Sequence, residues 1–197
     1  TDEGERLFEV EAATGRAHAL AVPAARPVFA AYTGDPGRLL VGIDDGNGRV
    51  RAVLYRRADW RVLAAEDDVA LARYDPGADA LLFSRSSVPG LWRSDASLRA
   101  IERVSAELPV PGHYRHWALF AGRAYSIVPD GDCATPWRPL AGAGEARCIS
   151  REGMAVGGSP AVDAAGRWLY LGLPVSQNVD VGWARLPRPS LAKAANR

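Results

Sequence analysis

The chain has 197 residues, of which 48% are hydrophobic and 24% are charged, as in an ordinary soluble globular protein. Its 24 basic and 23 acidic residues give a net charge of +1, which excludes the basic composition typical of nucleic-acid binding. No apolar run approaches the roughly 20 residues of a membrane-spanning helix. Because the chain begins with Thr1 and not with Met, we expect a processed or excised piece of a longer protein.

A short segment in which an aromatic residue precedes polar or basic residues recurs along the chain. In chain order, the aromatic residues are Phe8, Tyr55, Trp92, Trp137 and Trp183. Their spacing of roughly 40–45 residues is the length of one four-stranded propeller blade. We therefore expect the later tryptophans to pack between successive blades, rather than to form a binding stripe.

A second marker, a glycine turn before a short apolar run, recurs in step with the first. Its glycines are Gly37, Gly77, Gly122 and Gly166. At Asp35-Pro36-Gly37, proline presets φ, aspartate can bond to its own backbone and glycine accepts a positive φ, so the segment predicts a turn. Two independent markers with one period predict an all-β fold, a β-propeller of about four four-stranded antiparallel blades plus the last strands of another.

The predicted blade units follow one another in chain order, with strands named A to D from the axis outward. The units span 5–20, 27–65, 68–105, 113–150 and 154–187. The first supplies only strands C and D, and the last ends after strand C. Strand D is expected over 60–64 and 98–104 in the second and third units, and strand A over 155–162 in the last. Together they form a propeller domain over 1–188, followed by a flexible tail at 189–197. Exposed sheet edges favour aggregation, so the ring closes alone, with further chain, or with a second copy in a homodimer; all three stay open.

Two cysteines, Cys133 and Cys148, flank a glycine-containing segment at 141–144 that predicts a hairpin turn. Neighbouring strands could bring both sulfurs within bridging distance, although a turn centred there sets Cys148 opposite Trp137. A disulfide and two ordinary buried thiols both stay open. A bridge would favour an oxidising compartment, and hence a periplasmic or extracytoplasmic location.

Motifs of catalysis and metal binding are weak in this sequence. His113 and His116 precede or begin a predicted strand, where positions three apart diverge, so we expect no metal site there. Gly157-Gly158-Ser159-Pro160 lacks the second glycine of a nucleophile elbow. Asp44-Asp45-Gly46-Asn47-Gly48 lacks EF-hand ligand spacing and predicts a hairpin turn. We expect neither a cofactor nor a catalytic residue.

Polar side chains gather in the D–A and B–C loops, which a propeller brings to the same end. The candidate ligand-binding or partner-binding residues are Asp44, Asp45, Asp67, Asp130, Asp132, Tyr114 and Gln177. Glu66 and Asp68 lie in the same loops. Clustered carboxylates at a concave mouth would attract a cationic ligand or a basic peptide. The alternative is that they are solvated loop charges.

The segment 70–85, which ends in Leu91-Trp92-Arg93, resembles a TolB-type propeller repeat, and 162–171 with 180–186 is similar to the terminal repeat of that family. The order of the blades resembles the C-terminal propeller of CadC-like winged-helix transcriptional regulators. This resemblance implies a non-catalytic sensory or binding module, the extracytoplasmic part of a bacterial regulator or a TolB-like scaffold. Such a module would hold a protein or small ligand at the propeller mouth. The alternative is a propeller hydrolase or lactonase-like enzyme that uses the mouth carboxylates.

Overall fold

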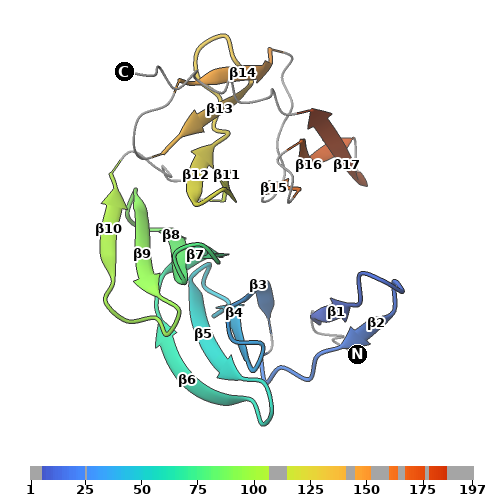
Figure 1. Cartoon of the computed structure of the whole chain (residues 1–197), viewed down its shortest axis with the longest axis vertical. Coiled ribbons are helices and arrows are strands. Elements are labelled where there is room, and N and C mark those ends of the chain that lie inside the picture. The colour runs from blue at the N-terminus through green and yellow to red at the C-terminus, as the bar shows by residue number, and fades with distance from the viewer. Residues whose placement is uncertain are drawn as a thin grey trace, which may run out of the picture. The chain divides into compact units, whose positions relative to one another are not determined.

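All regular secondary structure in the described chain is β-strand (Figure 1). The computed structural model describes residues 6–24, 26–106, 115–140, 145–151, 160–163, 167–175 and 178–185, with side chains described as far as residue 170. The chain divides into two compact units, Thr1–Arg115 with Leu140–Gly142, and His116–Pro139 with Ala143–Arg197. We call them unit 1 and unit 2. Within the described ranges, no helix has the length and apolar character needed to cross a bilayer.

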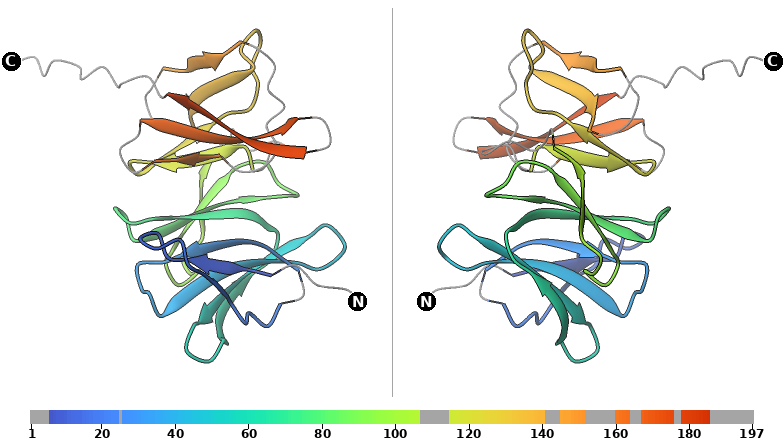
Figure 2. Two further views of the ribbon diagram at one scale, coloured as in Figure 1. Left: turned by 90° about the vertical axis from the view of Figure 1, so that its right-hand side faces the viewer. Right: turned by 90° about the vertical axis from the view of Figure 1, so that its left-hand side faces the viewer.

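Unit 1 contains one hairpin and two four-stranded antiparallel sheets, in which neighbouring strands are consecutive in sequence (Figure 2). The hairpin pairs β1 (Phe8–Val10) with β2 (Ala17–Ala19). The first sheet consists of β3 (Pro27–Tyr32), β4 (Arg38–Asp44), β5 (Val50–Arg56) and β6 (Arg61–Glu66). The second consists of β7 (Val69–Asp75), β8 (Ala80–Arg85), β9 (Leu91–Asp95) and β10 (Glu102–Ser105).

The described residues of unit 2 form one four-stranded and one three-stranded antiparallel sheet, again with consecutive strands as neighbours. One sheet consists of β11 (Trp117–Phe120), β12 (Arg123–Ser126), β13 (Thr135–Pro139) and β14 (Arg147–Ser150). The other consists of β15 (Ala161–Val162), β16 (Trp168–Val175) and β17 (Asn178–Arg185). The predicted strand after the glycine turn and the predicted aromatic strand are thus present in each of these sheets.

Aspartates hold several of the tight turns, as the sequence predicts, but the glycines do so differently. The Asp35 carboxylate accepts the Gly37 amide at 2.8 Å, and the Asp75 carboxylate accepts the Gly77 amide at 3.0 Å. Neither glycine has a positive φ, so that part of the prediction is wrong. The left-handed conformation falls instead on Asp79, at φ 45°, and on the pair Ala121 and Gly122, at 49° and 72°. Two successive positive φ angles are typical of a tight hairpin turn.

The two sheets of unit 1 pack on each other through one apolar cluster. Leu40, Ala52 and Leu54 of the first sheet meet Val69, Ala72, Leu81, Phe83 and Trp92 of the second. Trp92 stacks on Phe83, with ring centroids 6.4 Å apart. The prediction that Trp92 packs between neighbouring sheets is therefore confirmed.

The aromatic markers Phe8 and Trp92 differ in burial. Phe8 lies on the two-stranded β1–β2 hairpin, whereas Trp92 lies in a four-stranded sheet. Leu7, Leu20 and Val22 of the hairpin region pack against Tyr55 and other residues of the β3–β6 sheet. Phe8 itself is 58% exposed. Phe8 therefore carries the repeat signal without the buried position of Trp92 and Trp137.

The core of unit 2 forms between its two sheets. Ala118, Ile127 and Trp137 of the first sheet and its loops meet Leu169 of β16. Trp137 also stacks on Tyr125, with ring centroids 4.3 Å apart. Trp137 thus has the packing role that was predicted for it, while the Trp183 side chain lies outside the described residues.

Some predicted strand limits shift in the structure. The outer strand predicted over 98–104 begins only at Glu102, because Leu98 and Ala100 have φ angles of 59° and 51° and form a longer turn. The strand predicted over 60–64 begins at Arg61, after Trp60 at φ 54°. The limits of a single domain over 1–188 stay a prediction.

Several predicted features lie outside the described residues. They are His113, the turns at 141–144 and Gly166, most of the strand over 155–162, and the tail at 189–197.

Candidate functional site

A surface pocket opens at one end of the two four-stranded sheets of unit 1. It has a volume of about 710 Å³ and is formed by the β4–β5, β6–β7 and β8–β9 loops. These are the B–C and D–A loops that were expected at one end of a propeller. The lining residues are Asp45, Arg49, Val50, Arg51, Asp67, Asp68, Ser86 and Ser87.

The β4–β5 loop is a hairpin turn fixed by its own carboxylates. Asp44 Oδ1 accepts the Gly46 amide at 2.8 Å. Asp45 Oδ1 accepts the amides of Asn47 at 2.8 Å and of Arg49 at 3.2 Å. Gly46 and Gly48 have φ angles of 85° and 76°, which glycine adopts without the strain of a side chain. The predicted hairpin is present, and of its two aspartates only Asp45 lines the pocket.

Asp68 joins two of the pocket loops. Its carboxylate accepts the Ser86 amide at 3.0 Å, the Ser87 amide at 3.3 Å and the Ser87 hydroxyl. Asp68 also has a φ of 58°, an uncommon conformation for a residue other than glycine. Both carboxylate oxygens are therefore used in fixing the β8–β9 loop against the β6–β7 loop.

The charges of the pocket are mixed, because arginines stand beside the carboxylates. Arg51 Nε lies 3.2 Å from Asp67 Oδ1, in an ion pair whose side chains are both well exposed. Beside the lining, Arg85 pairs with Glu66 at 2.5 Å and donates to the Asp67 carbonyl at 2.9 Å. The lining itself carries three carboxylates and two guanidiniums. The carboxylates of this end therefore do not form the uniformly negative mouth that the sequence suggested.

Sequence reasoning missed the arginines and serines of this pocket. Arg49 and Arg51 follow the Asn-Gly turn, and Ser86 and Ser87 occupy the loop equivalent to Asp44 and Asp45 in the next sheet. The repeat period contained that equivalence, since corresponding loops of successive blades meet at one end. Carboxylates and aromatics alone do not mark these positions.

The remaining predicted site residues are not part of this pocket. Asp130 and Asp132 belong to the β12–β13 loop of unit 2, where Asp130 exchanges two backbone hydrogen bonds of 3.0 Å with Cys133. The Asp130 carboxylate also lies 3.5 Å from Arg138. Tyr114 and Gln177 lie outside the described residues.

A second pocket of unit 1, of about 610 Å³, lies among the A–B and C–D loops at the opposite end of the sheets. Its polar groups are bonded to one another. Tyr74 donates to Asp79 at 2.8 Å, while Arg38 pairs with Asp35 at 2.9 Å and donates to Ser97 at 3.2 Å. The hydrogen bond to the Asp79 carboxylate raises the pKa of Tyr74. These contacts give the second pocket a structural role.

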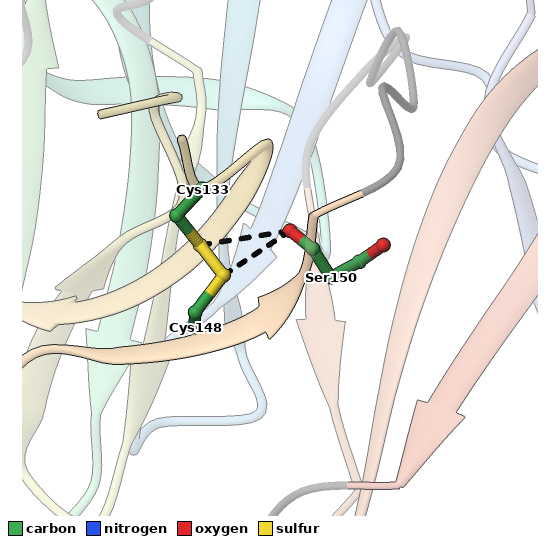
Figure 3. Close-up of a disulfide and its surroundings, with 3 residues drawn as sticks. All are labelled: Cys133, Cys148 and Ser150. Carbon is green, nitrogen blue, oxygen red and sulfur yellow. Dashed lines mark hydrogen bonds between the residues drawn. A yellow bond between two sulfur atoms is a disulfide. The ribbon is translucent and has the colours of Figure 1, made fainter. Parts of the chain in front are cut away.

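A disulfide joins Cys133 to Cys148 in unit 2, with an S–S distance of 2.01 Å and a Cα–Cα distance of 5.6 Å (Figure 3). The expected register is wrong by one residue, because Cys148 lies opposite Pro136 while Arg147 lies opposite Trp137. Beyond this pair, a register shift between Thr135 and Pro136 places Thr135 opposite Ser150. The sulfurs approach the Ser150 carbonyl oxygen to 3.5 and 3.3 Å; these are contacts and not hydrogen bonds, since a disulfide sulfur has no proton to donate.

Metal-binding geometry does not occur in the described part of the chain. No group of three or more His, Cys, Asp or Glu side chains there is placed to hold an ion.

Sequence comparison finds no matching family model and no matching curated protein. Comparison of structures finds β-propellers. TolB from Acinetobacter baumannii superposes with a TM-score of 0.62 at 14% identity, over 91% of this chain and 46% of TolB. The Cps50 (Swd1) propeller domain from Myceliophteria thermophila gives 0.56 at 10% identity, over 92% of this chain and 64% of that one. A luciferin-regenerating enzyme gives 0.50 at 13% identity, over 95% of this chain and 71% of the enzyme.

These similarities confirm the predicted fold. The chain is a β-propeller similar to TolB, built of antiparallel sheets. It spans less than half the length of TolB and less than two thirds of the Swd1 domain. At these identities the likeness concerns the fold, and function has to be argued from the residues of the site.

Proposed function

We propose that this chain is a non-catalytic binding module that holds a protein or small ligand in the pocket between the B–C and D–A loops of unit 1. One observation carries the proposal: three loops from two sheets converge on a pocket of about 710 Å³ with polar groups on its wall. Its size is within the range of small-molecule and peptide sites. Hydrogen bonds from the β8–β9 loop to Asp68 fix part of this wall before any ligand arrives.

The pocket suits binding better than carboxylate catalysis. A general acid or base needs a carboxyl group that is free to exchange a proton with its substrate. Both carboxylate oxygens of Asp68 instead accept hydrogen bonds from the β8–β9 loop, and Asp67 forms an ion pair with Arg51. The alternative is a propeller hydrolase or lactonase-like enzyme, because the luciferin-regenerating enzyme has a similar fold. The residues of this pocket support it less than they support binding.

The biological setting we favour is extracytoplasmic. A disulfide such as Cys133–Cys148 persists in oxidising compartments, and the TolB-like fold suits a scaffold or the sensory end of a CadC-like regulator. Labelling of free thiols before and after reduction, on protein taken directly from cells, tests this setting. Reaction of both cysteines without prior reduction would contradict it.

Pairing of two copies to complete a larger ring stays part of the proposal. Sedimentation across a wide concentration range tests it, with a mass that rises toward a dimer as the expected result. A constant monomeric mass would remove it.

The binding function is tested by selecting peptides from a random display library on the immobilised chain. The selected peptides should bind the wild type and lose binding to the double variant Asp45→Asn/Arg49→Gln. A matched control, Glu102→Gln/Arg99→Gln, removes the same charges from the outer strand and turn of the β7–β10 sheet and should bind as the wild type does. Selected peptides that bind both double variants equally would contradict the pocket as the site, and metal-dependent turnover of an ester or lactone panel would favour the enzyme.

A further inference from the structure

Most charged groups of the unit 1 pocket are already used by the protein. Asp68 accepts three hydrogen bonds from Ser86 and Ser87, and Asp67 forms an ion pair with Arg51. Asp68 can therefore bind a ligand only by giving up a hydrogen bond, and the charge of Asp67 is partly balanced by Arg51. The ligand chemistry of the pocket is therefore set by the groups that remain.

Two lining groups of opposite charge belong to no ion pair and keep a charged atom without a protein partner in the described part of the chain, and both belong to the β4–β5 hairpin. Asp45 uses Oδ1 for the turn amides, which leaves Oδ2 without a protein partner in the described part of the chain. The Arg49 guanidinium has neither a hydrogen bond nor an ion pair to any described residue, although its side chain lines the pocket. One acceptor and one cation are thus available on the same wall.

The hairpin holds these two residues as neighbours without pairing their charges. The Asp45 amide donates to the Arg49 carbonyl at 3.0 Å, so the residues stand opposite each other across the turn. Their side chains nevertheless form no ion pair with each other. In open water such a pair would be worth little, whereas a ligand charge that enters a concave site meets weaker screening.

A third polar group, the Ser86 hydroxyl, lies on the facing loop. Its amide is bonded to Asp68, but its hydroxyl has no partner among the described residues. A serine hydroxyl both donates and accepts, and so it suits the backbone of an extended peptide.

From these groups we infer that the pocket binds an extended peptide segment that carries an acidic and a basic side chain two residues apart, with the acid at Arg49 and the base at Asp45. This inference rests on the proposed binding function of the same pocket. Side chains two residues apart lie on one face of an extended strand, roughly 6–7 Å apart, so both can face the same wall of the pocket. The Ser86 hydroxyl bonds to the peptide backbone between them.

Ligands of a single charge fit this lining less well. A purely basic peptide would bring its cations toward Arg49 and Arg51, and a purely acidic peptide would meet Asp45, Asp67 and Asp68. Placing like charges together disfavours the wrong partner, so the mixed lining selects for a mixed ligand.

The test uses the full chain and three synthetic nine-residue peptides. The first consists of three Glu-Thr-Arg units, the second has lysine in place of every charged residue, and the third has glutamate in place of every charged residue. Binding is followed by the amide NMR shifts of Gly46, Gly48, Ser86 and Ser87 at low ionic strength. We expect the Glu-Thr-Arg peptide to bind most tightly. Asp45→Asn and Arg49→Gln should each weaken its binding about tenfold, the scale of one charge-assisted hydrogen bond.

These variants leave the hairpin intact, so that a loss of binding is informative. Asparagine keeps the acceptor oxygen that the turn amides use, and the Arg49 side chain takes no part in the turn. If the lysine peptide binds most tightly and only Asp45→Asn weakens it, or the glutamate peptide does so and only Arg49→Gln weakens it, the inference falls and the binding function stands. The inference also falls if no peptide shifts the pocket amides at millimolar concentration, and the library selection then decides the binding function separately.

Discussion

The four-stranded sheets of the two units share a topology but differ in how they are stabilised. In unit 1, strands β3 to β6 have six or seven residues each, and the sheet shares a large apolar cluster with its neighbour. In unit 2, strands β11 to β14 have four or five residues, and a disulfide ties the β12–β13 loop to β14. The same strand topology is therefore stabilised mainly by buried apolar side chains in the sheet with long strands, and additionally by a disulfide in the sheet with short strands.

The largest loss of stability is expected from a substitution in the apolar cluster of unit 1. Phe83→Ala removes a ring that is completely buried between the two sheets of unit 1 and stacked on Trp92. We expect the free energy of unfolding to fall by about 3–5 kcal/mol, through lost burial and the cavity left behind. Urea denaturation followed by tryptophan fluorescence measures it. Phe83→Leu is the control and should cost less, while a loss below about 1 kcal/mol for Phe83→Ala would contradict the assigned core.

The double variant Cys133→Ala/Cys148→Ala removes the disulfide of unit 2. A cross-link that closes a loop of 15 residues is worth about 3 kcal/mol, because it restricts the unfolded chain. We expect hydrogen exchange to quicken in β12, β13 and β14 and to stay unchanged in β3 to β10. Equal acceleration in both units would show that the bond does not act locally.

A smaller loss of stability is expected from a substitution that disturbs packing within the β3–β6 sheet. Gly42 lies opposite Phe29 in the β3–β4 pairing, and a methyl group at Gly42 would lie only 2.1 Å from the Phe29 ring. Gly42→Ala should therefore lower the free energy of unfolding by about 1–3 kcal/mol through overpacking. Combining it with Phe29→Leu should recover part of the loss. Strict additivity of the two changes would exclude the steric contact as the cause.

The smallest effect concerns the contact between the β1–β2 hairpin and the β3–β6 sheet. The Glu9 carboxylate accepts the Tyr32 hydroxyl at 2.5 Å and the Arg57 guanidinium at 2.8 Å. The Tyr32 hydrogen bond, followed by the Arg57 charge, lowers the pKa of Glu9, and the same hydrogen bond raises the pKa of Tyr32.

These two shifts predict loss of the hairpin contact at both ends of the pH scale. The Glu9 contribution is complete above the usual glutamate value of about 4.3 and is lost as pH falls through its lowered pKa. The Tyr32 contribution is complete below about 10 and is lost as pH rises through its raised pKa. Hydrogen exchange of β1 and β2 across pH, corrected for the intrinsic rate, measures both. Glu9→Gln should flatten the acidic limb, and an unchanged limb would contradict the assignment.

The repeat made the fold predictable because its signals are local. Asp35, Asp75 and the turn glycines fix where strands begin, and Trp92 and Trp137 fix which strand packs on the next sheet. The site was predictable only as an end of the propeller. Its charge balance depends on which side chains meet across loops, such as Arg51 with Asp67 and Asp68 with Ser87, and no spacing in the sequence encodes those contacts.

Local departures from the repeat were also not predictable from the sequence. Cys148 lies opposite Pro136, one position from the register that a turn centred on 141–144 predicts, and the positive φ of Leu98 and Ala100 delays the start of β10. Phe8 carries the repeat signal but lies on a two-stranded hairpin that leaves it exposed. Each case depends on neighbouring chain, so a periodic pattern could not contain it.

Every described pairing between strands joins segments that follow one another in the chain. Such a topology has a low contact order for a β protein, so loop closure costs little entropy at each step. Within each unit, a polypeptide of this kind can assemble vectorially, the later sheet forming on the earlier one as synthesis delivers it. An interruption of translation would then leave earlier sheets already formed, with one unsatisfied face awaiting the next.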